Sequence, residues 1–243
     1  MKNNSFLRWL PGLAVILGLT ALGLHRALYA VALDGKNLLT LWHPLAIALW
    51  AVTAVTVILV PLTLRKTENL RGYHRNHPGG LPGALGCFLM AACLGVTILQ
   101  GERMMAELVL GLGAIVGLVI VGLGRLRKKR PSYVYHALVC LYFALHLIGR
   151  YRFWRGNPQA EDYAFAMFAC VALMLFAYQQ TAFDGGYCSR RSQLTWGILS
   201  TYFCLAALSG GEEIPFYAGG ALWSLTNLCS TAPVPGRGEQ EVC

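Results

Sequence analysis

The feature that most constrains this chain is a series of apolar stretches, each long enough to cross a lipid bilayer and each bounded by a short polar segment. A membrane-spanning helix needs about 20 mostly apolar residues, because the helix rises ~1.5 Å per residue and the hydrocarbon core is ~30 Å thick. Of the 243 residues, 56% are hydrophobic and only 13% are charged. Soluble domains carry about 25% charged residues. The sequence therefore predicts an all-α fold, a polytopic bundle of transmembrane helices.

The apolar windows predict about eight spans. They are Leu10–Leu33, Leu45–Leu64, Leu81–Gln100, Glu107–Leu126, Tyr133–Arg150, Tyr163–Phe183, Leu194–Leu208 and Ile214–Thr231. The last two form one apolar stretch that is broken by a Ser-Gly-Gly-Glu-Glu segment and Pro215, residue types that favour a turn. Seven helices with a re-entrant or interfacial tail are the alternative. The loops are short, so we expect residues 1–243 to form one domain, with residues 232–243 as a disordered cytoplasmic tail.

The distribution of Lys and Arg predicts the orientation of the chain. If the N-terminus is inside, most of the 20 basic residues fall in inner segments, with clusters at Arg65–Arg75 and Arg125–Arg130. Basic residues in short loops favour the cytoplasmic side. Both termini are therefore expected in the cytoplasm. This topology and contact with anionic lipid head groups explain the net charge of +9, and no nucleic-acid partner is expected.

The eight cysteines do not indicate a disulfide framework or a metal site. Six lie within predicted spans, where Cys behaves as a small apolar residue, and the other two fall on the predicted inner side. No Cys-x-x-Cys pair is present. A metal site built from His25, His43 and His146 has no supporting ligand spacing. We therefore expect no metal and no cofactor.

The fifth predicted span carries a row of polar and aromatic side chains. Their spacing of seven, four, four and four residues places them on one face of a helix that turns by about 100° per residue. They are Tyr135, Tyr142, His146, Arg150 and Trp154. This face becomes more polar towards its outer end, where two acidic residues also open the sixth span. Ionisable groups inside a membrane are costly and mark functional sites.

Two interpretations of this outer end are open. In the structural one, aromatic residues lie in the membrane interface, arginines reach the head groups and acidic residues favour a helix N-terminus. In the functional one, polar residues from several spans line an outward-facing vestibule for a small zwitterionic or anionic solute. The candidate ligand-binding residues are His25, Arg26, His43, His146, Arg150, Trp154, Glu161 and Asp162. Glu212 and Glu213 occupy the last outer turn and can reach the same mouth.

Several membrane enzymes and pigments are excluded by the residues they require. No lysine lies within a span, so a retinal Schiff base has no attachment point. No Gly-x-Ser-Gly nucleophile is present, and Glu212-Glu213 lacks the arginine that follows in prenyl-protein proteases, where Tyr217 stands instead. The chain also has no Walker loop. No catalytic residue is assigned, and an enzymatic role is the less favoured one.

Four segments between His136 and Asp184 form a recognisable pattern. They are His136-x3-Cys140, Tyr151-Arg152-x-Trp154, Pro158-Gln159-x-x-Asp162-Tyr163-x-Phe165, and Met174-Leu175-x-Ala177-Tyr178 with Phe183-Asp184. Together these segments resemble a family of small membrane proteins from clostridial bacteria. The resemblance covers about 50 residues. That family has no assigned activity, so the resemblance implies a multi-pass protein of the bacterial cytoplasmic membrane and adds no catalytic residue.

Three functions remain as hypotheses. The first is a small-solute carrier or binding protein with a vestibule around His146 and Arg150. The second is a sensory or accessory subunit that packs on another membrane protein or on a second copy of itself. Gly113 and Gly117 have the spacing of a close helix contact, which such packing could use. A contact within the bundle is nevertheless favoured for these two glycines. The third is a lipid-modifying enzyme that uses His146 with Glu161 or Asp162 as acid and base.

Overall fold

The fold of the chain is given by a computed structural model, which describes residues 4–31, 43–66, 80–100, 105–127, 131–154, 160–184, 189–210 and 213–230. Within these ranges the chain is helical, and no strand is found in them. The elements are α1 (Asn4–Val31), α2 (Pro44–Thr63), η1 (Leu64–Lys66), α3 (Gly80–Leu99), α4 (Met105–Leu126), α5 (Tyr133–Trp154), α6 (Ala160–Asp184), α7 (Arg190–Ala207), η2 (Leu208–Gly210) and α8 (Ile214–Ser230). The expected tail at 232–243 lies outside the described residues.

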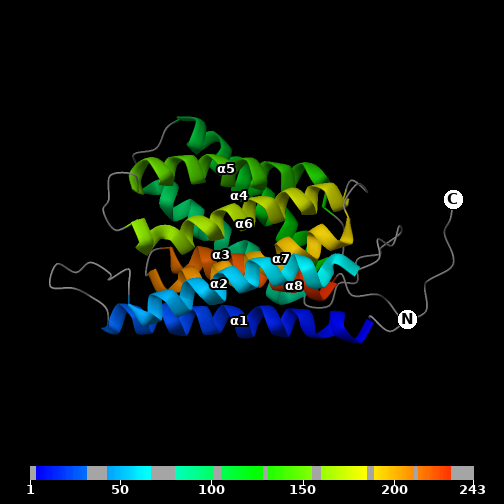
Figure 1. Cartoon of the computed structure of the whole chain (residues 1–243). Helices are drawn as coiled ribbons and strands as arrows, with labels where there is room; N and C mark the ends of the chain where they lie inside the picture. Colours follow the sequence, from blue (N-terminus) through cyan, green and yellow to red (C-terminus); the bar gives the residue numbers. More distant parts are fainter. Residues whose placement is uncertain are drawn as a thin grey trace.

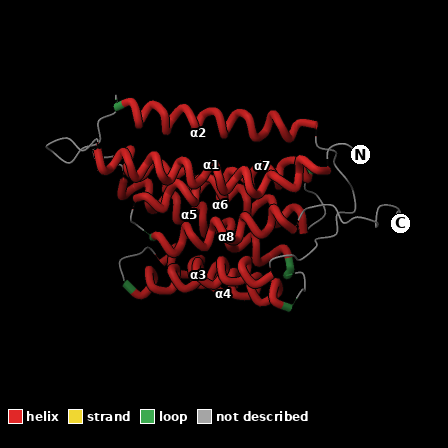
Figure 2. Tube along the Cα trace, turned by 90° about the horizontal axis from the view of Figure 1, so that it is seen from below, coloured by secondary structure: helices red, strands yellow, loops and turns green. Residues whose placement is uncertain are grey.

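The helices lie side by side with their long axes roughly aligned, as expected for a membrane bundle (Figure 1). Helix α1 begins and α8 ends at the same end of this bundle. Viewed from below, α2 lies at one margin and α3 and α4 lie at the opposite one (Figure 2). The all-α bundle predicted from the sequence is thus confirmed, whereas a cytoplasmic location for both termini stays a prediction.

Within the described residues, six helices are long and apolar enough to cross a membrane, so the chain has the make-up of a multi-pass membrane protein. These spans are Trp9–Val31, Pro44–Thr63, Gly80–Leu99, Glu107–Leu126, Tyr133–Tyr151 and Tyr163–Ala182. The first six predicted spans match them closely. Helices α7 and α8 run within the same bundle but do not belong to this set, and a total of eight spans stays a prediction.

Helix α7 is the central helix and is buried along most of its length. It packs on α1, α2, α6 and α8. Its polar side chains bond to neighbouring helices, since Thr201 Oγ1 lies 2.8 Å from Ser224 Oγ of α8 and the Tyr202 hydroxyl lies 2.8 Å from Thr53 Oγ1 of α2. A helix surrounded by protein does not need the apolar surface that lipid requires. This explains why α7 carries a weak transmembrane signal in the sequence.

Helices α3 and α8 approach each other closely through two glycines. A Cβ atom on Gly86 would lie 2.6 Å from the carbonyl oxygen of Gly219 and 2.9 Å from the amide nitrogen of Trp223. Small residues let helix backbones approach in a membrane, where van der Waals packing rather than the hydrophobic effect joins helices. The backbones therefore meet at this point, and no side chain fits between them.

The glycines of α4 are likewise used inside the bundle. A Cβ on Gly117 would lie 3.0 Å from the carbonyl oxygen of Tyr135 in α5, and one on Gly113 would lie 3.9 Å from Leu138 of the same helix. Both glycines therefore face α5, as the sequence favoured, with Gly117 buried and Gly113 half-buried. This pair gives no support to a docking face for another protein.

We expect Gly86→Ala to lower the free energy of unfolding by about 1–3 kcal/mol, because the new methyl group meets rigid backbone atoms of α8. Gly95→Ala is the matched control in the same helix, since nothing lies within 4 Å of a Cβ at that position. The control should change stability by less than about 1 kcal/mol, and in the stabilising direction. Unfolding of the detergent-solubilised variants measures both. Equal stability of the two variants would contradict the close α3–α8 contact.

Candidate functional site

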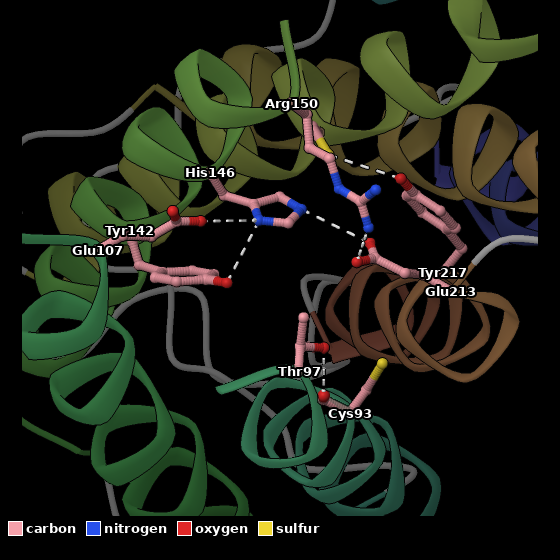
Figure 3. A network of polar contacts seen from close by, with 9 residues as sticks. Cys93, Thr97, Glu107, Tyr142, His146, Arg150, Glu213 and Tyr217 are labelled. Atoms are coloured by element: carbon pink, nitrogen blue, oxygen red, sulfur yellow. Dashed lines mark hydrogen bonds and ion pairs between the residues drawn. The ribbon is translucent and has the colours of Figure 1, made fainter. Parts of the chain in front are cut away.

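Four ionisable side chains meet at one end of the bundle, where α4 begins, α5 ends and α7 turns into α8. They are Glu107 of α4, His146 and Arg150 of α5, and Glu213, which directly precedes α8 (Figure 3). We call these four residues the polar cluster. In the sequence they come from three separate segments, so only the packing of the helices brings them together.

His146 lies between the two carboxylates of the cluster. Its Nδ1 atom is 3.8 Å from Glu107 Oε1 and its Nε2 atom is 3.5 Å from Glu213 Oε2. The Tyr142 hydroxyl, one turn earlier on α5, lies 3.3 Å from Nδ1. The imidazole side chain is only 2% exposed. A histidine in this position can pass a proton between two carboxylates, because each ring nitrogen faces one of them.

Arg150 pairs with Glu213 through one terminal guanidinium nitrogen, which donates a hydrogen bond to Glu213 Oε1. The two side chains are 22% and 13% exposed, so the pair lies near the surface of the bundle end while His146 lies beneath it. Glu213 therefore bridges the two residues of α5. One carboxylate oxygen faces the guanidinium and the other faces the imidazole.

The backbone of Glu213 is strained. Its φ angle is +48°, in the left-handed region, and Glu213 alone among the described non-glycine residues has a positive φ. Left-handed backbone costs an ordinary residue about 1–2 kcal/mol. The Glu213 carbonyl oxygen accepts bonds from the amides of Phe216 and Tyr217 and so starts α8. Strain of this kind is found where the surrounding structure holds a functional side chain in place.

Aromatic and sulfur-containing side chains surround the polar cluster. The rings of Tyr142 and Phe216 lie 5.5 Å and 5.8 Å from the His146 ring, measured between centroids. The Tyr217 hydroxyl lies 3.8 Å from Cys170 Sγ of α6, and Cys93 of α3 reaches the side of the cluster near Glu213 (Figure 3). The charges therefore lie against weakly polar walls, where electrostatic interactions are stronger than in water.

The environment of Glu213 favours its ionised form. Burial on its own raises the pKa of this carboxyl, but the hydrogen bond and charge of His146 and the charge of Arg150 outweigh burial and lower the pKa from 4.5 to about 2. Glu213 is therefore a carboxylate at neutral pH, and its two partners stabilise it in that form.

Two further candidate residues meet at the same bundle end but in a separate group of contacts. His25 of α1 is buried, hydrogen-bonds to the Ser209 hydroxyl and packs on Phe165, with ring centroids 4.9 Å apart. Arg26 is exposed, and its guanidinium donates to the Leu208 carbonyl oxygen at 3.4 Å. These contacts hold α1 against the α7–α8 connection, which is a structural role.

The remaining candidate residues have other positions. His43 caps α2, since its Nδ1 atom accepts a hydrogen bond from the Leu45 amide at 3.3 Å. Trp154 ends α5, and Glu161 and Asp162 lie in the first turn of α6, but their side chains lie outside what the structure describes. Of the eight candidates, His146 and Arg150 thus lie in the polar cluster. Three others make contacts elsewhere, and the side chains of the remaining three lie outside the described structure.

Glu107 and Cys170 are not among the candidates predicted from the sequence, and Glu213 was predicted to reach the same mouth without being one of those candidates. Glu107 stands at the predicted outer end of its span, at the same depth as Arg150. The predicted depth in the membrane was thus a signal in the sequence that could have identified both Glu107 and Glu213. For Cys170 no such signal exists, because a cysteine in an apolar helix looks like any small core residue.

The described His, Cys, Asp and Glu side chains contain no group of three or more that could hold a metal ion. In the polar cluster the reason is geometric. The carboxylates of Glu107 and Glu213 face opposite nitrogens of the His146 ring, so a single ion cannot contact all three side chains.

A different buried cation lies elsewhere in the bundle, at the C-terminal end of α4. Arg125 donates hydrogen bonds to Thr226 Oγ1 at 3.1 Å and to Asn227 Oδ1, both in α8. A Cβ on Gly83 of α3 would lie 2.5 Å from its guanidinium, so a glycine leaves room for it. These contacts join α3, α4 and α8 and serve their packing.

Comparisons of the chain with family models, with curated proteins and with solved structures find no match. The resemblance to a clostridial membrane family stays a prediction from the four quoted segments.

We expect Glu213→Gln to destabilise the protein near neutral pH and to lose that effect in acid. A carboxyl whose pKa falls on folding contributes stability above its ordinary pKa of 4.5, and this contribution is lost as the pH falls through 4.5 towards about 2. The difference should reach about 3 kcal/mol at neutral pH. Thermal unfolding of both proteins across this pH range measures it. A difference that does not vary with pH would contradict the ionised Glu213.

Proposed function

We propose that this chain is a small-solute carrier or binding protein of a bacterial cytoplasmic membrane, and that the polar cluster is its solute site. One observation carries the proposal: four ionisable side chains from α4, α5 and the α7–α8 connection converge at one end of the bundle. Charged groups in a bilayer protein are costly and persist where they mark a substrate or ion pathway.

The arrangement of the cluster suits a reversible site better than a purely structural ion pair. A purely structural ion pair needs one cation and one anion. Here Glu213 contacts both Arg150 and His146. A second carboxylate, that of Glu107, lies on the far side of the imidazole. Arg150 and both carboxylates keep partial access to the surroundings, with exposures of 22%, 16% and 13%. A small solute with charged groups can therefore take the place of one of these charged side chains beside its partner.

A lipid-modifying enzyme is the second candidate, and a specific observation favours it. His146 has a carboxylate on either side, which is the arrangement of an oriented acid–base histidine. The sequence suggested Glu161 or Asp162 as its partner, whereas the described structure places Glu107 and Glu213 there. A carrier binds its solute and releases it unchanged, whereas an enzyme releases a product.

An accessory subunit that packs on another protein is less well supported. The glycine pair that suggested a docking face lies on the side of α4 that faces α5. Packing on a partner protein would also leave the polar cluster unexplained. If no solute acts on the protein, this hypothesis becomes the leading one.

We expect a metabolite that binds the cluster to raise the melting temperature of the detergent-solubilised protein. A ligand at a hundredfold excess over its Kd stabilises the folded state by about 2.7 kcal/mol. His146→Ala and Arg150→Ala should abolish the shift. Arg127→Ala is the matched control, because Arg127 is an exposed arginine just beyond the other end of α4 from Glu107, and it should keep the shift.

The same screen separates the candidate functions. A solute recovered unchanged from the protein supports the carrier or binding protein, and conversion to a product supports the enzyme. A shift that persists in both cluster variants would place the solute elsewhere. No shift with any solute would overturn the assignment of the cluster as a site.

A further inference from the structure

We propose that the solute is a small monocarboxylate, which binds Arg150 in place of Glu213 while Glu213 takes up one proton. This inference rests on the proposed function and names its substrate class. It also couples binding of the solute to the uptake of one proton. The observation behind it is that the site already holds a carboxylate in the position that such a solute would occupy.

The charges of the cluster set the stoichiometry. Arg150 contributes one positive charge, Glu107 and Glu213 contribute two negative ones, and a proton on His146 brings the sum to zero. An extra buried charge without a partner is strongly disfavoured in a medium of low dielectric constant. A bound monocarboxylate adds one negative charge. One proton taken from solution by Glu213 restores the balance, and no bond other than that O–H bond forms.

Glu213 is placed so that it can leave Arg150. It lies on the connection between η2 and α8, not inside a helix, and its backbone is in the left-handed region. Arg150 and His146 lie on α5, where the helix fixes their positions. A change at Glu213 can therefore include its own backbone, whereas at Arg150 only the side chain can move while the end of α5 stays helical.

The groups around Glu213 decide which residue takes the proton. His146 and Arg150 face it from α5, Cys93 from α3 and Tyr217 from α8, while Glu107 of α4 lies beyond His146. When a competing carboxylate binds Arg150, Glu213 loses the guanidinium as a partner. It is then left beside weakly polar side chains and the imidazole of His146. Since Arg150 helps to lower the pKa of Glu213, its loss as a partner raises that pKa.

The surrounding side chains favour a carboxylate with a small apolar body. The planar guanidinium of Arg150 matches the two oxygens of a carboxylate. Rings of Tyr142 and Phe216 flank His146, and the Tyr217 ring lies beside Glu213, so a solute that displaces Glu213 from Arg150 is placed among weakly polar rings (Figure 3). A phosphate dianion would bring a second negative charge, and Glu213, the carboxylate that it would displace from Arg150, can take up only one compensating proton.

The test measures binding of acetate, propionate and benzoate to the detergent-solubilised full chain over a series of pH values, from the shift in melting temperature. The matching neutral amides are the control ligands. We expect the carboxylates to bind and the amides not to bind. The apparent affinity should fall about tenfold for each pH unit of increase, because one proton is taken up with each carboxylate. Calorimetry in buffers of different ionisation enthalpy should give the same stoichiometry.

Two substitutions test the roles of the residues. Glu213→Gln mimics the protonated carboxyl, so this variant should bind the carboxylates more tightly at neutral pH and with no dependence on pH. Arg150→Gln should weaken binding at least tenfold. Both variants should still unfold cooperatively, and Arg127→Ala should bind as the unaltered chain does.

Each outcome is decisive. Binding by the unaltered chain that does not vary with pH, or a Glu213→Gln variant with unchanged pH dependence, overturns the proton exchange. Binding of amines, amides or phosphate in place of the carboxylates overturns the substrate class but leaves the solute site in the polar cluster intact. Loss of every solute response would instead overturn the proposed function itself, so the two failures are distinguishable.

Discussion

The constraint on which the structure depends is that hydrocarbon offers no hydrogen-bond partner, so the chain must satisfy its own polar groups. Helices satisfy the backbone within each segment. Threonines within the helices follow the same rule by bonding to the carbonyl oxygen four residues earlier, as seen for Thr20, Thr53, Thr56, Thr97, Thr181, Thr195, Thr201 and Thr226. The ionisable residues cannot do this alone, so they are drawn together from different helices.

This constraint links the fold to the site. Helices α4 and α5, which carry Glu107 and His146, pack closely at Gly117, and α8, which Glu213 directly precedes, packs closely on α3 at Gly86 and Gly219. The strained backbone of Glu213 is the cost of directing its carboxylate at α5. Close packing and a polar cluster are therefore two parts of one arrangement, since neither the carboxylates nor the imidazole would be tolerated alone in lipid.

The candidate site could be predicted only in part, for reasons that differ between residues. His146 and Arg150 were accessible to prediction because they lie four residues apart on one helix face. Their carboxylate partners lie 39 residues before and 67 residues after His146 in the numbering, and no periodicity connects such distant positions. His25 and His43 share a predicted depth with them, yet one bonds to Ser209 and the other caps α2. Depth in the membrane does not specify the direction in which a side chain points.

The sequence by itself determined that the chain is an all-α bundle with at least six apolar helices of membrane-spanning length, because lipid selects length and apolarity residue by residue. It also determined that polar residues gather at helix ends. The tertiary structure decided that α7 lies in the centre and that Glu213, from a connection between helices, lies between Arg150 and His146. Such pairings depend on which helix faces meet, and that is a property of the packed bundle and not of any single segment.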